Sequence, residues 1–388
     1  MINSSSRLFV IVHKYHRSIQ AVRNVTLLLI GVFLGINYRL LLATLCQNIA
    51  VVQFTQFSVS HQASAIQQQT TCEESLLSPV ESLLRLAVAQ KVNSAPVFRL
   101  LGHVYSVQGD WERAEEQYLQ ALQASPQDTI TYLFLGNVYD ARGRPGEAIL
   151  AWRQAKAARY FLNQVTARRL AGDLAGALEM YHLVLQLDPS LVPTDLRVEV
   201  AGIYYYSLGQ KGEAEREFLA AVQQSVKDGR DKQALAYGEL GIYYAREEHC
   251  DEKAVQALQQ AVALTPDAAN YRLWLGWCYK EIGLLDQAEE ELLRASATSN
   301  IYIRGTAYLR LGETYGLARD WEKAIRAFNM AVELLPGSIE ARTYLARAYQ
   351  EAGQLDNALH AYQSLLEIYP DNEELRARYN ELWMQLHK

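Results

Sequence analysis

The chain has 388 residues, of which 50% are hydrophobic, and a formal net charge of -6 at pH 7. Residues 1–72 contain no Asp or Glu, so the rest of the chain carries -11, which is the total of -6 less the five positive charges of this segment. The five cations are Arg7, Lys14, Arg17, Arg23 and Arg39. The acidic body argues against nonspecific nucleic-acid binding, which requires a net basic face.

The N-terminal region begins with a polar, basic tail over residues 1–24, which an apolar stretch over residues 25–46 follows. As a helix, the apolar stretch would be about 33 Å long, enough to cross the hydrocarbon core of a bilayer. We expect a transmembrane signal anchor, although Arg39 interrupts it, because the long arginine side chain can reach the nearer interface. The positive-inside tendency then places the N-terminus in the cytoplasm and the repeats described below across the membrane.

Other interpretations of the apolar stretch stay open. A cleaved signal peptide would make the protein secreted or periplasmic, but the nearest A-x-A pattern, residues 63–65, lies far downstream. Residues 42–46 match a lipoprotein box only in part, since Leu45 stands where a small residue is needed. The Ser and Arg content without acids also fits a transit peptide to an organelle.

Residues 47–72, rich in Gln, Ser and Thr, are predicted to be a polar tether.

A helical period begins at residue 73. Val80, Leu84 and Ala87 lie at the spacing of one apolar helical face, as expected for the second helix of a pair. No convincing first helix precedes them. Residues 73–94 are therefore predicted to form an N-terminal half-repeat.

The clearest unit of the body is residues 308–336, which the pattern predicts to be two short helices joined by a turn at Arg319 and Asp320. The apolar faces carry Tyr308, Leu311, Gly312 and Tyr315 on the first helix, and Ala324, Phe328 and Ala331 on the second. Small residues let two antiparallel helices approach closely, and we expect the rings of Tyr315 and Phe328 to fill the gap.

The same pattern recurs eight times over residues 95–372, with repeats that start near Ala95, Thr129, Ala158, Asp195, Ala234, Ala269, Gly305 and Ile339. This spacing resembles the tetratricopeptide repeat, a helix-turn-helix unit of 34 residues. The resemblance implies an all-α fold, a right-handed α-solenoid in which each helix pair buries its apolar stripe against the next pair. Residues 373–388 are predicted to be an amphipathic helix that caps the last repeat.

The third repeat departs from the pattern, since Gln164, Val165 and Arg168 stand where other repeats have Leu, Gly and Tyr. Positive charge gathers in the same region, with only Glu147 as an acid among seven cations. These cations are Arg142, Arg144, Arg153, Lys156, Arg159, Arg168 and Arg169. The charge favours an acidic partner or a phosphate-bearing surface. The alternative is that the basic side chains are spread around the helices without a common face.

In proteins resembling this family, the first helices line a concave binding groove through a stripe beside the core face. The candidate ligand-binding residues here are Arg99, His103, Asn137, Arg159, Arg169, Tyr206, Arg246, Trp277 and Lys280. Bulky aromatic and donor side chains on that stripe have no expected packing role inside the repeat, which favours a ligand role for the stripe. The alternative for any single one of these residues is a solvated face. Arg99, His103 and Asn137 resemble the carboxylate clamp of chaperone-binding relatives, but His103 replaces its Asn and the third repeat lacks its Lys and Arg pattern, so chaperone binding is not predicted.

No phosphate-binding, zinc-protease or serine-hydrolase motif occurs, so we expect neither catalysis nor a cofactor. The four cysteines, Cys46, Cys72, Cys250 and Cys278, form no C-x-x-C pair and no spacing typical of a zinc site or a disulfide framework. His249 and Cys250 lie near acids, with Cys278 as a sequence-near candidate, but a metal site is not predicted there.

Taken together, the patterns predict a membrane-anchored, non-catalytic scaffold that binds a partner protein or peptide in the concave groove of the repeats. An alternative is an accessory subunit of an envelope polysaccharide synthesis, export or transport complex, which would recognise a glycan or an enzyme. The sequence does not specify the partner or the oligomeric state.

Overall fold

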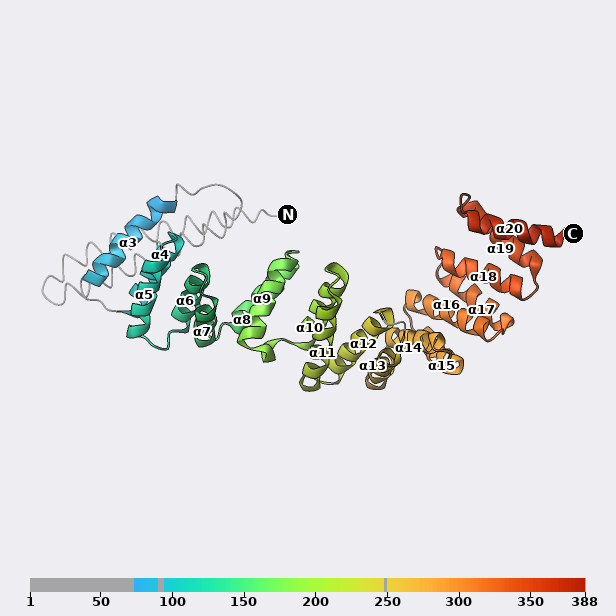
Figure 1. Ribbon diagram of the computed structural model, residues 1–388, viewed down its shortest axis with the longest axis horizontal. Coiled ribbons are helices and arrows are strands. Elements are labelled where there is room, and N and C mark those ends of the chain that lie inside the picture. Colours follow the sequence, from blue (N-terminus) through green and yellow to red (C-terminus); the bar gives the residue numbers. More distant parts are fainter. Residues whose placement is uncertain (1–72, 90–93, 248–249, 388) are drawn as a thin grey trace. The chain divides into compact units, whose positions relative to one another are not determined.

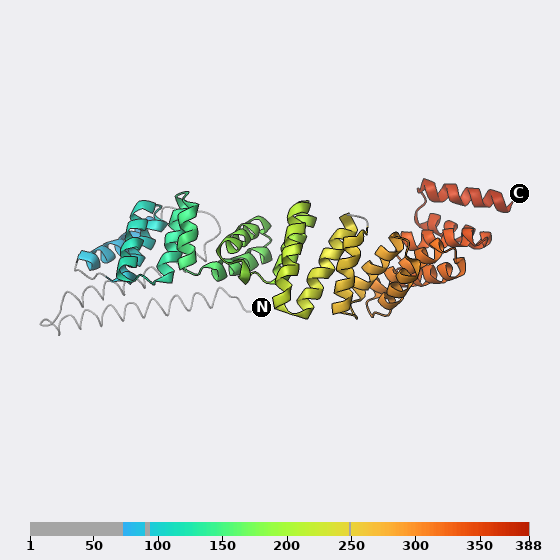
Figure 2. The same cartoon turned by 60° about the horizontal axis from the view of Figure 1, so that its bottom comes forward.

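The computed structural model describes residues 73–89, 94–247 and 250–387, and this part of the chain is entirely helical (Figures 1 and 2). It contains eighteen α-helices and no strand, which confirms the predicted all-α class. The predicted basic tail, signal anchor and tether fall in residues 1–72 and lie outside the described residues. Of the helices that the structure does describe, none is both long and apolar enough to cross a membrane.

The helices follow one another in pairs, after a single leading helix, α3 (Glu73–Ala89). The first helices of the pairs are α4 (Ala95–Val107), α6 (Thr129–Ala141), α8 (Ala158–Leu170), α10 (Thr194–Gly202), α12 (Arg230–Glu247), α14 (Ala269–Glu281), α16 (Ile301–Leu317) and α18 (Ile339–Glu351). The second helices are α5 (Trp111–Ala124), α7 (Pro145–Gln154), α9 (Leu174–Leu187), α11 (Lys211–Asp228), α13 (Glu252–Leu264), α15 (Leu285–Ser296), α17 (Trp321–Leu334) and α19 (Leu355–Ile368), and α20 (Glu373–Leu386) ends the series.

The chain divides into two compact units. Of the described residues, one unit comprises those up to Ala167 together with Met180–Leu187, and the other comprises Arg168–Glu179 together with those from Asp188 onward. The division therefore runs through α8 and α9, the helices of the third repeat. Within the second unit, successive first helices contact one another from α10 to α18, so their side chains form a common side of that unit.

Short polar caps and turn residues define where the helices begin. Asp110, Asp251 and Asp320 each accept a hydrogen bond from the backbone N–H three residues ahead, which caps α5, α13 and α17. Arg319, directly before one of these caps, has a φ of 59°, in the left-handed region. The predicted turn at Arg319 and Asp320 is thus present, with an arginine in the conformation that glycine adopts in most other turns of this chain.

Close approach of the paired helices depends on glycines that face large side chains. A Cβ on Gly312 would lie 2.5 Å from the ring of Phe328, and one on Gly136 would lie 2.4 Å from the indole of Trp152. These distances are far below van der Waals contact, so the two helices can pack this closely only without a side chain on the first. The predicted pairing of Gly312 with Phe328 is confirmed.

Tyr315 has a different role from the one predicted. Its hydroxyl donates to Glu289 on α15, the second helix of the preceding repeat, at 2.9 Å. Tyr244 makes the equivalent bond to Glu215 on α11, and Tyr279 accepts one from Gln259 on α13. These tyrosines therefore join one repeat to the repeat before it, and it is Phe328 that fills the gap beside Gly312.

The fourth repeat differs by one residue from the predicted register. Helix α10 begins at Thr194, and the buried small residue that faces α11 is Ala201. Tyr204 is buried with it, although a repeat that starts at Asp195 has Tyr205 at the position that Tyr105 occupies in the repeat starting at Ala95. A five-residue π-helix, Ile203–Ser207, follows α10 and absorbs the extra residue before α11 begins.

The two ends of the described chain complete their neighbouring repeats. Val80, Leu84 and Ala87 of α3 are buried in the same core as Leu101 and Tyr105 of α4. At the other end, Leu375 and Leu382 of α20 are buried against α19. Trp383 and Met384 on the opposite side of α20 stay exposed, as expected for an outermost helix.

Candidate ligand-binding surface

The first helices of the second unit bring four side chains together. The guanidinium carbon of Arg246, near the end of α12, lies 5.7 Å from the ring centre of Tyr206 in the π-helix and 4.9 Å from that of Trp274 on α14. Trp274 packs edge to face on Trp277, with ring centres 5.1 Å apart. We call these four residues the Arg246 stack.

The Arg246 stack unites three predicted residues, Tyr206, Arg246 and Trp277, with one that the sequence pattern did not single out. Trp274 lies three residues before Trp277 on the same helix, so the two indoles share a face. That i, i+3 spacing of two tryptophans is the signal that could have identified Trp274.

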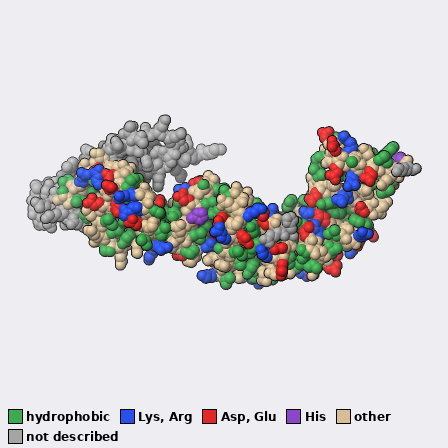
Figure 3. Space-filling model, in the orientation of Figure 1, with side chains coloured by type: hydrophobic (Ala, Val, Ile, Leu, Met, Phe, Trp, Pro, Cys, Tyr) green, Lys and Arg blue, Asp and Glu red, His purple; other side chains and the backbone are tan. Residues whose placement is uncertain are grey.

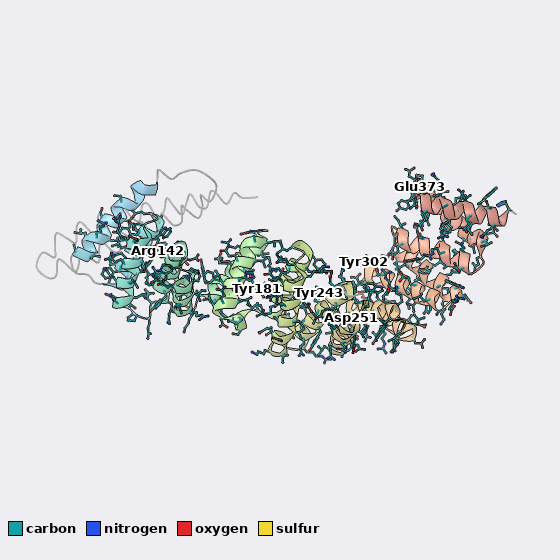
Figure 4. The ribbon with its side chains drawn as sticks, in the orientation of Figure 1. Arg142, Tyr181, Tyr243, Asp251, Tyr302 and Glu373 are labelled. Carbon is teal, nitrogen blue, oxygen red and sulfur yellow. A yellow bond between two sulfur atoms is a disulfide. The ribbon has the colours of Figure 1, made fainter. Side chains whose placement is uncertain are left out.

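The π-helix determines how Tyr206 is presented. Tyr205 donates a hydrogen bond of 2.7 Å to Glu247, which also pairs with Lys211 at 2.6 Å. Burial and this bond raise the pKa of Tyr205 to about 12. The ring of Tyr205 packs edge to face on Tyr206 and on Tyr243, which is labelled in Figure 4. Tyr206 packs on Tyr205, and it remains 64% exposed to solvent.

A disulfide lies directly behind the Arg246 stack. Cys250, which follows α12, is joined to Cys278 of α14, with their Cα atoms 4.7 Å apart. Cys278 is the residue after Trp277, and both cysteines are fully buried. The bond thus ties the end of α12, which carries Arg246, to the helix that carries both tryptophans.

This disulfide corrects the interpretation of the cysteines. Their sequence separation of 28 residues gave no indication of pairing, because it is the packing of α12 beside α14 that brings the two sulfurs together. Both thiols are consumed by the bond, and the described residues contain no cluster of His, Cys, Asp and Glu that could hold a metal ion.

Arg246 has no acidic partner among the residues that the structure describes, and its side chain is exposed. Glu239, two turns earlier on α12, is half-buried; burial raises the pKa of its carboxyl group, while the positive charge of Arg246 opposes the rise. Trp277 donates through Nε1 to Glu281 at 2.9 Å, which fixes the indole. The stack therefore presents one cation and aromatic surface on helices that are already fixed.

Lys280, the next predicted residue, is not available in the same way. Its ammonium group pairs with Glu281 at 2.8 Å and with Glu313 on α16, and its side chain is only 10% exposed. Arg310 joins the same cluster through Glu313 and through Glu340, at 3.2 Å. Lys280 thus holds α14 against α16.

A pocket of about 350 Å³ opens beside this ionic cluster, between α14, α16, α17 and α18. Its lining includes Lys280, Glu313, Leu317, Trp321, Tyr344 and Arg347. Leu317 is 61% exposed at its edge. The first helices of the second unit therefore offer both the Arg246 stack and a pocket that could receive a side chain.

The predicted residues of the first unit have packing roles that the sequence pattern did not indicate. Arg99 pairs with Asp128, the N-cap of α6. His103 stacks on Phe134 with ring centres 4.7 Å apart, and burial lowers the pKa of its imidazole. Asn137 accepts a hydrogen bond of 3.0 Å from Nε1 of Trp152. The premise that such side chains lack a packing role is wrong for these three, and ligand binding by them stays a prediction.

The basic region around the third repeat is largely paired with acids. Arg142, labelled in Figure 4, pairs with Glu115 on α5, and Arg144 pairs with Glu115 and Glu147. The space-filling view likewise shows acidic and basic side chains interspersed on the surface that it presents (Figure 3). Glu115, which lies outside the basic segment in the sequence, thus offsets part of the positive charge expected there.

The two arginines named as ligand candidates in this region differ from each other. Arg169 pairs with Glu199 on α10, within the second unit. Arg159 is exposed and belongs to the first unit. The two arginines therefore belong to different units, and binding by either one remains a prediction.

Comparison with known proteins identifies the repeats. Models of the tetratricopeptide repeat match residues 99–160, 252–300 and 317–382. These segments lie in both units and include α14, which carries Trp274 and Trp277, and α17 and α18, which line part of the pocket. The helix pairs there are tetratricopeptide repeats, as the spacing of the sequence indicated.

Curated relatives match much of the chain at low identity. The chain is 23% identical over 319 residues to the protein CTR9 homolog of Arabidopsis thaliana, covering 76% of this chain and 29% of that protein. It is 28% identical over 280 residues to the cellulose synthase operon protein C of Xanthomonas axonopodis pv. citri, covering 67% and 16%. The chain spans less than a third of the length of either relative.

Among solved structures, a thermophilic tetratricopeptide-repeat protein of Thermus thermophilus matches 49% of this chain and 99% of its own at 24% identity, with a TM-score of 0.37. A MamA protein matches 48% and 94% at 25% identity, with a TM-score of 0.40.

Proposed function

We propose that this protein is a non-catalytic interaction scaffold, in which α10, α12 and α14 bind an extended segment of a partner protein. The observation that carries the proposal is the Arg246 stack, where Tyr206 is exposed and Arg246 has no acidic partner within the described residues. Aromatic and arginine side chains are the residues that most often dominate the binding energy of protein interfaces.

The neighbouring pocket supports an extended rather than a compact ligand. It is bounded by α14, α16 and α18, which continue the series of first helices beyond the Arg246 stack. A partner segment anchored on Trp274 and Trp277 could continue along these helices and place a side chain beside Leu317. Extended segments that lie across successive repeats suit solenoids, whose surface grows one repeat at a time.

We also propose that the repeats lie in an oxidising compartment, on the far side of the membrane that residues 25–46 would cross. The Cys250–Cys278 disulfide supports this placement, because such bonds persist mainly outside the reducing cytosol. A cleaved signal peptide or targeting to an organelle would also satisfy this condition. Carbonate extraction of membranes, with antibodies to both ends of the chain, distinguishes an uncleaved anchor from these alternatives.

A second candidate function is recognition of a glycan within an envelope polysaccharide complex. The exposed ring of Tyr206 beside two indoles favours it, because sugars can stack on aromatic faces, and the similarity to a cellulose synthase operon protein points to the same class. The proposal of a protein ligand takes precedence, since Arg246 adds a fixed charge that a neutral glycan would not use.

The test is capture of ligands by the full chain from detergent extracts, with wild type compared with Arg246→Ala and Trp277→Ala. Arg216→Ala on α11 is the matched control, since Arg216 is an exposed arginine that pairs only within its own helix, with Glu213. A protein retained by wild type and by the control, but lost from both stack variants, supports the proposal. A partner held equally by all four proteins would place binding elsewhere, and a glycan array screened with the same variants tests the second candidate.

A further inference from the structure

The charge and geometry of the Arg246 stack specify a kind of ligand, and the inference rests on the function proposed above. We infer that Arg246 binds the side-chain carboxylate of an Asp or Glu inside the partner's extended segment. An apolar side chain next to that acid packs on Trp274 and Trp277. The ligand is thus an acidic residue flanked by an apolar one.

The first argument is that the guanidinium group is held in place by its surroundings. Tyr206 reaches it from the π-helix on one side of α12, and Trp274 reaches it from α14 on the other. Aromatic rings contact the flat face of a guanidinium, so its N–H groups remain at the edge and keep their donor capacity. An arginine held in this way loses less side-chain entropy on binding a carboxylate than a free one would.

The second argument is that nearby cations of the second unit, Lys211 and Lys280, are paired with acids, whereas Arg246 is not. Lys211 pairs with Glu247, and Lys280 pairs with Glu281 and Glu313. Within the described part of the chain no acid pairs with Arg246, although Glu247 is the next residue. Glu247 is engaged by Tyr205 and Lys211 instead. The π-helix, which supplies Tyr205, thus keeps the adjacent acid occupied elsewhere.

The third argument selects a carboxylate over a phosphate. A single arginine forms two parallel hydrogen bonds to a carboxylate, which carries one negative charge. A phosphate group would bring nearly two negative charges close to the half-buried Glu239, whose carboxyl group already lies within electrostatic range of Arg246. Because Arg246 is a single cation close to the carboxyl group of Glu239, it favours a carboxylate with one negative charge over a phosphate with nearly two.

The fourth argument selects an internal acid over a terminal carboxylate. The Arg246 stack extends from the π-helix after α10 to α14, and the pocket lies on the side of α14 that faces α16 and α18, all within the second unit. A segment that places its acid at Arg246 can therefore continue in both directions.

The experiment selects peptides from a displayed library of random twelve-residue sequences on the full chain in detergent, with disulfides intact. Wild type is expected to enrich Asp or Glu next to an aromatic or aliphatic residue. Arg246→Gln removes the charge but keeps a polar side chain with N–H donors, and it is expected to lose the acidic enrichment while retaining the apolar one. Arg216→Gln is the control and should select the wild-type motif.

The best selected peptide is then synthesised with Glu or Gln at the selected acid, and with a free or amidated C-terminus. We expect the Glu to Gln change to weaken binding to wild type by about tenfold or more, and Arg246→Gln to bind the two peptides equally. Amidation should leave the affinity unchanged; a loss on amidation would overturn the choice of an internal acid.

The remaining outcomes separate the inference from the proposed function. Enrichment of apolar sequences without acids, abolished by Trp277→Ala, would keep the peptide-binding function and overturn the carboxylate assignment. Acidic enrichment that persists with Arg246→Gln would also overturn it. A library that yields no sequence dependent on the stack would contradict the proposed function itself.

Discussion

The ring of Phe328 occupies the space that a side chain on Gly312 would need, since a Cβ there would lie 2.5 Å from two of its carbons. The same relation holds between Gly102 and Tyr118, and between Gly276 and Leu292. Close contact between the two helices of a repeat thus depends on the absence of one atom, and the nature of the facing side chain is secondary.

Substituting Ala for Gly312 should therefore destabilise the second unit by roughly 1–3 kcal/mol, because the ring of Phe328 must move or the helices must separate. Gly212→Ala in α11 is the matched control, since a Cβ there meets nothing within 4 Å. Because Gly212 is the second residue of α11, the substitution should leave stability unchanged or raise it by at most about 1 kcal/mol. Thermal denaturation followed by circular dichroism measures both. Shifts of the same sign would show that the facing ring is not the cause.

The Cys250–Cys278 bond should contribute about 2–4 kcal/mol to stability, by restricting the unfolded chain over 28 residues. Cys278→Ser is expected to lower the thermal midpoint, and a reducing agent should lower that of wild type to the same value. The reducing agent should have no effect on the variant. Thiol titration of the unfolded, unreduced protein checks the bond directly, and four reactive thiols would disprove it.

Stability should fall at alkaline pH because of tyrosines such as Tyr205. Burial and the hydrogen bond to Glu247 raise its pKa from 10.0 to about 12, so the folded state keeps a proton that the unfolded state has lost. The stability this proton provides is complete below pH 10 and disappears as the pH rises towards 12. Tyr205→Phe should flatten the decline over this range in urea titrations. The exposed Tyr302, labelled in Figure 4, provides the control Tyr302→Phe, which should follow wild type.

Amide hydrogens of α8 and α9 should exchange faster than those of α6 and α12. Val165 stands in α8 where Gly136 and Gly241 allow close contact in other repeats, and the boundary between the two compact units runs through these helices. A repeat that makes weak contacts with its neighbours unfolds locally at a low free-energy cost. Hydrogen exchange with peptide-level mass spectrometry measures this order. Equal protection across the four helices would refute a weak third repeat.

The sequence predicted the features that depend on local spacing. The helical class, the turn before Asp320 and the pairing of Gly312 with Phe328 all follow from apolar residues and glycines at fixed intervals. Tyr206, Arg246 and Trp277 could be placed on one stripe for the same reason, because successive first helices present equivalent positions on one side.

Other features depend on contacts between distant residues, and spacing alone did not indicate them. In the repeat pattern, a tyrosine stands three residues after a small residue. Ala201 with Tyr204 and Gly202 with Tyr205 both satisfy this spacing, so the sequence allows two registers. Only packing on α11 selects Tyr204 as the buried ring. The acid Glu115 that pairs with Arg142 and Arg144 lies in another helix pair. The disulfide likewise requires knowing that α12 lies beside α14.

The π-helix also shows how such a chain can acquire a new surface. An inserted residue in the middle of a helix normally rotates everything after it by about 100°, since an α-helix has 3.6 residues per turn. Here Ile203–Ser207 confine the change to five residues, so α11 keeps its buried face while the side chain of Tyr206 is exposed. A single codon gained or lost at this point would alter the surface that we propose to bind the partner without rebuilding the core, which makes this turn a natural starting point for redesigning that surface.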